Sequence, residues 1–287
     1  MIRLDEAAVE RRLAAIDLVA LMRETLCAAA GGHGGGPVRA SFTTSHGVWF
    51  AAMPAWVGGF DDTDDPREAA LSALGAKLVV AVPQNAARGL PTHRAVVVLL
   101  DPQTGEPVAW VDAEALTRAR TAAVSVLATD VLARVPRGAH AILCAGAQGR
   151  AHLDAFVRAA MVRRLAVWSR DRAHAAALAD YARSLGIESR VAAGADDAVR
   201  GADVISTCTA SAEPLFDAAS VADGAHVNAV GACVAHKREL PARLVGDASG
   251  VVDDVGAAHA EAGDVILAVG ECAASWEGVV PLGEILA

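Results

Sequence analysis

From residue 116 onward, short apolar segments alternate regularly with segments of helical periodicity. The apolar segments cover residues 139–144, 164–168, 190–192, 204–208, 226–230 and 250–253, and the helical segments cover 121–134, 148–160 and 172–185. Strands separated by helices need crossover connections, which make neighbouring strands parallel. The alternation therefore predicts an α/β fold built on a doubly wound parallel sheet.

Residues 1–115 have a different pattern, which predicts a smaller α+β domain. A helical stretch over 5–30 and a glycine-rich loop over 31–37 precede apolar segments at 48–53, 77–82, 94–100 and 107–111, with a turn at 101–105. Such a meander is typical of a mixed or antiparallel sheet, and the acidic stretch 61–68 is expected to be a solvated loop. The predicted domains are 1–115, 116–275 and a C-terminal segment, 276–287, that returns toward the first domain.

The turn Cys-Ala-Gly-Ala-Gln-Gly at 144–149 stands between the first strand and the first helix of the second part. A dinucleotide-binding fingerprint has G-x-G-x-x-G at this place, where the helix N-terminus attracts the pyrophosphate. Gly146 and Gly149 match two of the three glycines, and Cys144 occupies the position of the first. The turn predicts a Rossmann-type domain with Gly146, Ala147, Gln148 and Gly149 at the cofactor; an ordinary strand-to-helix turn is the alternative.

The end of the second strand predicts which dinucleotide binds. A site that prefers NAD places an acidic residue there for the ribose hydroxyl, whereas this chain has Ser169 and Arg170. A guanidinium suits a 2′-phosphate, so NADP(H) is the preferred cofactor. Asp171 follows directly, which leaves NAD(H) possible. The alternative is that Arg170 is an ordinary surface residue before a helix.

Charge and hydropathy exclude several classes of partner. The net charge is −9 with no basic block, which argues against nucleic acid and anionic membranes. No apolar run approaches the roughly 18 residues of a membrane span, and residues 1–5 lack the apolar stretch of a signal peptide. The five cysteines are widely spaced without a metal-binding pattern. The expectation is a cytoplasmic protein with reduced thiols and no metal.

Two basic residues are candidates for substrate chemistry. Lys77, one of only two lysines, is expected at the edge of an apolar strand, either as a paired, partly buried ammonium or as a strand-end charge that reaches water. A desolvated lysine can exchange protons near neutrality. Arg120 is expected to start the helix before the nucleotide-binding strand, where it could hold a carboxylate through two hydrogen bonds.

Several segments, in order over nearly the whole chain, resemble the ornithine cyclodeaminase/μ-crystallin family. They are Met-Pro-Ala (53–55), Lys77 with Pro-Gln-Asn (83–85), Leu-Thr-Arg-Ala-Arg-Thr-Ala-Ala (116–123), Ala-Gly-Ala-Gln (145–148), Gly-Ala-His-Val-Asn-Ala-Val-Gly-Ala (224–232) and Arg-Glu-Leu (238–240). The resemblance implies a homodimer whose N-terminal domain binds substrate and dimerises, and whose Rossmann domain binds the cofactor.

The resemblance also implies roles for individual residues. Arg39, Lys77 and Arg120 match substrate-carboxylate and catalytic positions. The positions that match cofactor contacts are Thr121, Ala147, Gln148, Ser169 and Arg170. The predicted cofactor site also includes Gly146, Gly149, Thr207 and Val230. Cyclodeaminases carry an aspartate where this chain has Cys233, a departure that is similar to the branch of ketimine reductases and 1-pyrroline-2-carboxylate reductases. A small packed residue is the alternative for Cys233.

The expected activity is NAD(P)H-dependent reduction of a small cyclic ketimine carboxylate, either 1-pyrroline-2-carboxylate or 1-piperideine-2-carboxylate. Arg39 and Arg120 would hold the carboxylate, and Lys77 would keep the ring nitrogen protonated, because a protonated imine accepts hydride more readily. The alternatives are an ornithine cyclodeaminase, an amino-acid dehydrogenase, and a non-catalytic NADP(H)-binding protein. Typical family members continue beyond the position equivalent to residue 287, which keeps the last alternative open.

Overall fold

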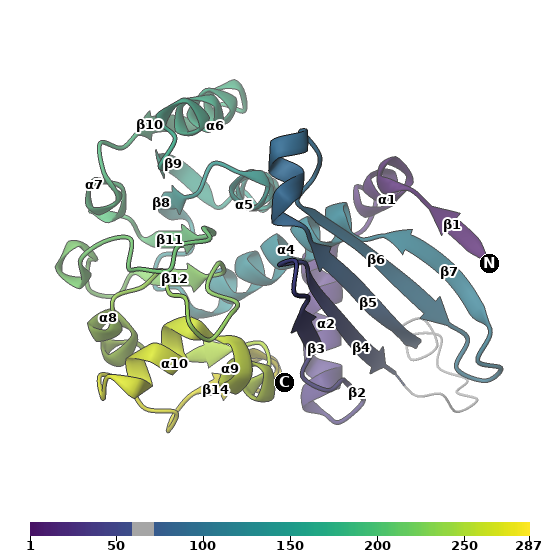
Figure 1. Cartoon of the computed structure of the whole chain (residues 1–287). Coiled ribbons are helices and arrows are strands. Elements are labelled where there is room, and N and C mark those ends of the chain that lie inside the picture. Colours follow the sequence, from purple (N-terminus) through teal and green to yellow (C-terminus); the bar gives the residue numbers. More distant parts are fainter. Residues whose placement is uncertain (59–71) are drawn as a thin grey trace. The chain divides into compact units, whose positions relative to one another are not determined.

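The computed structural model describes residues 1–58 and 72–287 (Figure 1). The described residues form two compact units, Met1–Thr117 with Gly283–Ala287, and Arg118–Leu282. The acidic stretch 61–68, expected to be a solvated loop, lies outside the described residues. Within 1–58 and 72–287, no helix combines the length and the apolar character that crossing a membrane requires.

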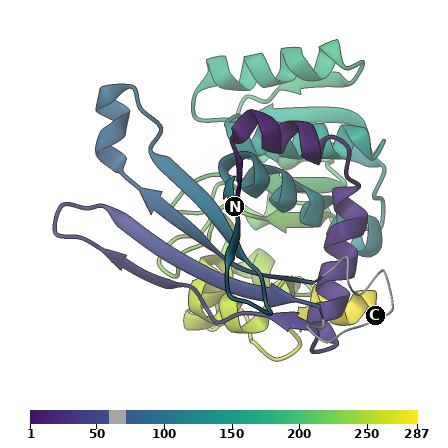
Figure 2. The ribbon, with the colours of Figure 1, turned by 90° about the vertical axis from the view of Figure 1, so that its right-hand side faces the viewer.

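Unit 1 is built on a mixed sheet, as the meander pattern predicts (Figures 1 and 2). In the described residues the strand order is β1-β7-β6-β5-β4-β2, with β3 also paired to β4; only the β1–β7 pair is parallel. The strands are β1 (Ile2–Leu4), β2 (Gly34–Gly35), β3 (Ala40–Thr43), β4 (Trp49–Val57), β5 (Ala73–Ala81), β6 (His93–Leu100) and β7 (Pro107–Asp112).

The turn between β6 and β7 follows the sequence prediction. The Asp101 carboxylate accepts the N–H groups of Gln103 and Thr104, both at 2.9 Å, and these bonds lower the pKa of Asp101. Gly105 has a φ of +75°, a conformation that costs glycine little. The side chain of Asp101 therefore fixes the turn locally.

The predicted helical stretch 5–30 is two helices, α1 (Glu6–Leu13) and α2 (Leu18–Ala30). The reason is Asp17, whose carboxylate accepts the N–H groups of Val19 and Ala20 and starts a second helix. The prediction of a loop over 31–37 is wrong at Gly34 and Gly35, which pair with Trp56 and Val57. The pairing is non-local, so composition alone did not indicate it. A short 3-10 helix, η1 (Pro83–Arg88), follows β5.

Unit 2 has a five-stranded, wholly parallel sheet of order β10-β9-β8-β11-β12. Its strands are β8 (Gly138–Leu143), β9 (Val162–Trp168), β10 (Glu188–Val191), β11 (Val204–Thr207) and β12 (His226–Ala229). The first strand, β8, lies in the middle of the sheet; β9 and β10 follow on one side, and β11 and β12 follow on the other. This is the doubly wound order expected from the alternation. The strand expected at 250–253 is not part of this sheet: β13 (Val251–Val252) pairs with β14 (Val280–Pro281) instead.

The helix before β8, α4 (Glu114–Leu132), begins earlier than the sequence pattern suggested. The Asp112 carboxylate accepts the N–H of Glu114 at 3.0 Å, which starts the helix directly after β7. Arg120 therefore lies in the second turn of α4, and the expectation that it starts the helix is wrong. The remaining helices are α5 (Ala147–Arg158), α6 (Arg172–Ser184), α7 (Ala195–Val199), η2 (Ala218–Ser220), α8 (Ala242–Asp247), α9 (Val255–Glu261), α10 (Gly263–Gly270) and α11 (Leu282–Leu286).

The two faces of the unit 2 sheet carry different packing. Ala141, Leu143 and Ile205 are fully buried in an apolar cluster with the residues of α7. His140, which alternates with them, faces α5, where its ring lies 4.8 Å from the Phe156 ring. The side chains of β8 therefore alternate between the α7 face and the α5 face, and both faces are buried, as expected for parallel strands.

Candidate functional site

The turn between β8 and α5 offers a site for an anion. Gly146 is the N-cap residue of α5, and within the described chain no side chain caps this helix. The Gly146 N–H donates to Cys144 Sγ at 3.3 Å. The N–H groups of the following residues point out of the helix end, where the helix dipole favours negative charge.

The glycines of this turn meet the requirements of a dinucleotide-binding site. A Cβ on Gly149 would lie 2.2 Å from the Cys144 carbonyl oxygen, so only glycine lets α5 pack this close to β8. A Cβ on Gly146 would come within 4 Å only of Cys144 Sγ among the described atoms, which leaves the outer side of the turn open. Gln148 Oε1 is buried and has no hydrogen-bond partner in the part of the chain that the structure describes. The open turn and the uncapped helix end fit a pyrophosphate-containing cofactor, whereas the Gln148 oxygen needs a donor and does not pair with pyrophosphate oxygens.

A buried histidine, which the sequence patterns did not single out, anchors the helix behind the turn. His152 is fully buried in α5, and its Nδ1 lies 2.8 Å from the Gln148 carbonyl oxygen. Because a carbonyl only accepts, Nδ1 carries the proton, and Nε2 accepts from the Ser125 hydroxyl of α4 at 3.0 Å. Burial lowers the pKa of His152, so the ring is neutral and ties α5 to α4.

The end of β9 carries the residues expected to select the cofactor. Ser169 is half-buried, and Arg170 is exposed. Asp171 caps α6 by accepting the N–H groups of Ala173 at 2.8 Å and His174 at 3.3 Å, and these bonds lower its pKa. One carboxylate oxygen of Asp171, the residue that left NAD(H) possible in the sequence, is thus engaged at a helix N-terminus.

A buried glutamate joins the loops that follow β11 and β12. Glu239 is fully buried, and its carboxylate accepts the N–H of Thr209 at 2.5 Å and the N–H of Gly231 at 2.7 Å. Burial raises the pKa of Glu239, and the two N–H donors oppose that rise. Thr207 ends β11 and Val230 follows β12, so this carboxylate holds the backbone next to both predicted cofactor positions.

Sequence reasoning did not assign a role to Glu239, although it stands in the Arg-Glu-Leu segment. The Glu239 N–H and the Leu240 N–H both donate to Asp264 Oδ1, at 2.7 and 2.8 Å. A Cβ on Gly231 would lie 2.6 Å from Glu239 Oε2. The signal in the sequence was the acidic residue itself, within a segment that resembles the family. Its close contact with Gly231 becomes visible only in three dimensions.

In unit 1, the structure brings Lys77 together with a threonine that the sequence patterns missed. Lys77 pairs with Met53 on β4 and Val97 on β6, so it lies in the middle of β5 and the expectation of an edge position is wrong. Its Nζ donates to Thr117 Oγ1 at 3.4 Å, and Thr117 Oγ1 donates to the Ala113 carbonyl at 2.6 Å. The half-buried ammonium is therefore oriented by a hydroxyl that is itself fixed.

The other predicted substrate residues are placed as follows. Arg39 lies between β2 and β3, half-buried, with its guanidinium carbon 5.8 Å from the centre of the Trp49 ring. Arg120 and Thr121 are half-buried on α4, three and four residues after Thr117. Cys233 is exposed in the loop after β12.

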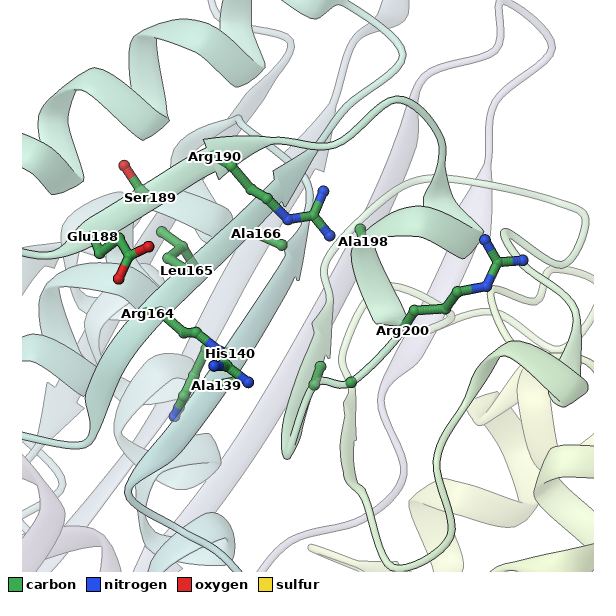
Figure 3. A pocket seen from close by; sticks show the side chains of 12 residues that line it. Ala139, His140, Arg164, Leu165, Ala166, Glu188, Ser189, Arg190, Ala198 and Arg200 are labelled. Atoms are coloured by element: carbon green, nitrogen blue, oxygen red, sulfur yellow. The ribbon is translucent and has the colours of Figure 1, made fainter.

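A pocket of about 280 Å³ lies elsewhere, beside the amino-terminal residues of β8 and β10 and the middle of β9 (Figure 3). Arg164, Glu188, Arg190 and Arg200 line it, and Arg190 forms an ion pair with Asp197 at 2.8 Å. In open parallel sheets ligands bind at the carboxyl ends of the strands. None of the predicted site residues lines this pocket, so it is not the cofactor site.

The parallel sheet, its strand order and the turn at α5 define unit 2 as a Rossmann-type α/β domain. The chain belongs to the ornithine cyclodeaminase/mu-crystallin family, whose model matches residues 3–286. This match confirms the family resemblance from which the roles of individual residues were predicted. Those roles remain proposals.

Among the relatives, ketimine reductase mu-crystallin of Rattus norvegicus is 36% identical over 222 residues, which is 77% of this chain and 66% of the rat protein. The chain thus spans slightly less than two thirds of that relative. The structure of Thermococcus litoralis Δ1-pyrroline-2-carboxylate reductase with NADH and L-proline has 27% identity and a TM-score of 0.90 over 100% of this chain and 86% of that one. An archaeal alanine dehydrogenase dimer with bound NAD has 28% identity and a TM-score of 0.89 over 100% and 85%.

Proposed function

We propose that this protein is an NAD(P)H-dependent reductase of a small cyclic ketimine carboxylate. The observation that carries the proposal is the similarity of the fold, over the whole chain, to a pyrroline-2-carboxylate reductase solved with NADH and L-proline. The dinucleotide turn at α5 and the oriented lysine in unit 1 support it with the chemical groups that such a reduction needs.

The cofactor, when bound, supplies the hydride for the imine carbon. The first turn of α5 binds the pyrophosphate through the N–H groups that follow Gly146. Thr121, Thr207 and Val230 contact the remainder of the cofactor, and the Glu239 carboxylate keeps the backbone beside the last two in place.

The substrate is bound and polarised by three basic residues. Arg39 and Arg120 bind the carboxylate through charge-assisted hydrogen bonds. Lys77 donates a proton to the ring nitrogen or holds it there, because a protonated imine accepts hydride more readily than a neutral one. The Thr117 hydroxyl, 3.4 Å from Nζ, positions the ammonium for this step.

The reductase prefers NADPH to NADH. Arg170 is exposed at the end of β9, where its guanidinium is available to a 2′-phosphate, and Ser169 adds a hydroxyl. Asp171 caps α6 through one carboxylate oxygen, which fixes its side chain at the helix N-terminus. This preference differs from the cofactors named for the two solved relatives, NADH and NAD.

The protein works as a homodimer in the cytoplasm. Unit 1 exposes large apolar side chains on its sheet, including Phe42, Val108 and Trp110, which favours association with a second copy. The archaeal alanine dehydrogenase of similar fold was solved as a dimer. The five cysteines are odd in number and widely spaced, which supports a reducing compartment.

The test is to follow the absorbance of NADPH and, in parallel, NADH, with 1-pyrroline-2-carboxylate and with 1-piperideine-2-carboxylate. We expect turnover of at least one imine, faster with NADPH, and we expect Arg170→Ala to remove the advantage of NADPH. Lys77→Met should lower kcat by roughly a hundredfold or more, the usual contribution of a positioned acid. Lys237→Met, at the other lysine, is the matched control and should retain activity.

Other outcomes would assign the chain differently. Turnover of alanine with oxidised cofactor, but of neither imine, would make it an amino-acid dehydrogenase. Conversion of ornithine to proline would make it a cyclodeaminase. Tight binding of NADPH without turnover of any of these substrates would identify a non-catalytic NADP(H)-binding protein. Full activity of Lys77→Met would overturn the proton-donor role alone.

A further inference from the structure

Two cysteines lie opposite each other at the carboxyl ends of adjacent strands. β8 and β11 are parallel, with Leu143 opposite Thr207, so the next residues in register are Cys144 and Cys208. The Cys208 N–H donates to the Leu143 carbonyl at 3.4 Å, which continues the pairing to this point. Neighbouring strands are about 4.8 Å apart, within the Cα separation of roughly 4.4–6.8 Å that a disulfide spans.

The two thiols are on the same face of the sheet. Leu143 and Ile205 point to the α7 face, so alternation places Cys144 and Cys208 on the α5 face. Cys208 Sγ lies 3.7 Å from Nδ1 of His152 on α5. Cys144 Sγ accepts the N–H of Gly146, the N-cap of α5, at 3.3 Å. Both sulfur atoms therefore lie beside the amino-terminal half of the same helix.

The two thiols differ in access to solvent. Cys144 is partly exposed, whereas Cys208 is 8% exposed and burial raises the pKa of its thiol well above the usual range. An oxidant from solution reaches Cys144 first, because the raised pKa keeps the buried Cys208 protonated and protects it from direct oxidation. Cys208 is the neighbouring thiol that resolves the product, in a step that is slow because Cys208 must give up its proton. Cys144 also stands where a dinucleotide fingerprint has its first glycine, a substitution that cofactor binding does not explain.

We propose that Cys144 and Cys208 are a site of reversible oxidation to a disulfide, located directly beneath the cofactor-binding turn. With hydrogen peroxide as the oxidant, the Cys144 thiolate attacks one peroxide oxygen and the O–O bond breaks, which yields a sulfenic acid and, after protonation of the leaving hydroxide, water. The Cys208 sulfur then displaces the sulfenic hydroxyl, which leaves with the Cys208 proton as a second water. The two thiols lose two electrons and the peroxide is reduced; a dithiol reductant reverses the step.

The disulfide changes the turn that binds the cofactor. A Cys144 sulfur bonded to Cys208 is turned away from Gly146, so the N-cap residue loses the acceptor of its N–H. Loss of one hydrogen bond corresponds to an affinity change of roughly three- to tenfold, so we expect dinucleotide binding to weaken by about that factor. This coupling rests on the proposed function, whereas the formation of the disulfide does not.

The experiment treats the reduced full-length chain with hydrogen peroxide and maps disulfides by mass spectrometry of peptides prepared without reductant. We expect a linked pair of peptides containing Cys144 and Cys208, lighter by two hydrogens and separated again by dithiothreitol. The link should form equally in Cys272→Ser, which removes an exposed thiol, and should be absent in Cys144→Ser and Cys208→Ser. Oxidation of Cys144 to sulfinic acid without a link to Cys208, or links through Cys233 or Cys272 only, would overturn the proposal.

NADPH titrations of the same samples, followed by fluorescence, test the coupling. Oxidised wild-type protein should bind NADPH roughly three- to tenfold more weakly and recover on reduction, whereas Cys144→Ser should not respond to peroxide. A disulfide that leaves the affinity unchanged would overturn the coupling. If the reduced protein does not bind NADPH at all, the proposed function fails, and the peptide map still decides whether the disulfide forms.

Discussion

Replacing His140 by leucine should change how the stability of this protein depends on pH. His140 is 2% exposed on β8, and burial lowers its pKa from 6.5 to about 4, although the carbonyls of Pro136 and Met161 favour its charged form. In the unfolded chain the imidazole titrates near its ordinary pKa. Between pH 6.5 and 4 the unfolded state therefore binds a proton that the folded state excludes, and stability falls as the pH falls through this window.

The size of the effect follows from the shift. At about 1.4 kcal/mol per pKa unit, the change from 6.5 to about 4 corresponds to about 3 kcal/mol of unfolding free energy lost between pH 7 and pH 4. His152 and His226, whose pKa values are also lowered by burial, are present in both proteins and cancel in the comparison. The difference between wild type and His140→Leu thus isolates His140.

The assay is urea unfolding of both proteins at several pH values from 7 to 4, followed by circular dichroism. We expect the stability of His140→Leu relative to wild type to rise by about 3 kcal/mol over this range, because the variant lacks the titration. His236→Leu, at an exposed histidine, should run parallel to wild type. Parallel curves for wild type and His140→Leu would refute the argument that burial of this imidazole opposes its protonation.

Three further changes test the geometry of unit 2. Gly149→Ala places a Cβ 2.2 Å from the Cys144 carbonyl and should cost about 1–3 kcal/mol of stability and weaken NADPH binding. Gly270→Ala, at the end of α10, meets nothing within 4 Å beyond its chain neighbours and its own helix in the described chain, and should do neither; equal effects would contradict the close packing of α5. Glu239→Gln sets an amide NH2 donor against one of the two backbone N–H donors that the carboxylate accepts. It should lower stability by roughly 1–3 kcal/mol in thermal melts. A neutral result would show that the two loops do not depend on the carboxylate. Arg190→Gln breaks the surface ion pair with Asp197 and the hydrogen bond from Arg190 to the Asp197 carbonyl, and it should cost about 1 kcal/mol in urea. A much larger loss would mean that these contacts are not screened by solvent.

Local sequence signals were sufficient to predict most of the helices and strands of unit 2. The period of the apolar residues and the glycines at 146 and 149 indicated β8, α5 and β9 to within two residues. Helix caps and turns act over three or four residues, as Asp171 and Asp101 illustrate, so they leave a readable pattern in the chain. Each segment that resembles the family is likewise a short uninterrupted stretch, so the resemblance could be recognised from the sequence alone.

Contacts between distant segments were decided only by the tertiary structure. Gly34 and Gly35 form a strand because Trp56 and Val57 lie beside them. Lys77 lies in the middle of β5 because pairing with β4 and β6 extends the strand back to Ala73. Thr117 reaches Lys77 across 40 residues of chain. The composition of a short segment does not show which remote segment it will pair with, so these contacts could not be predicted from local sequence patterns.

The contacts of the groups around the cofactor turn also depend on segments that are distant in the sequence. The sequence by itself determined the parallel sheet, the glycine-dependent turn and the residue types at the ends of the strands. Only the folded chain brings the Glu239 carboxylate to the N–H groups of Thr209 and Gly231, and Cys208 to the carbonyl of Leu143, the residue before Cys144. Hydrogen bonds and thiol chemistry act over a few ångströms of space, and that proximity is set by packing, which local periodicity does not encode.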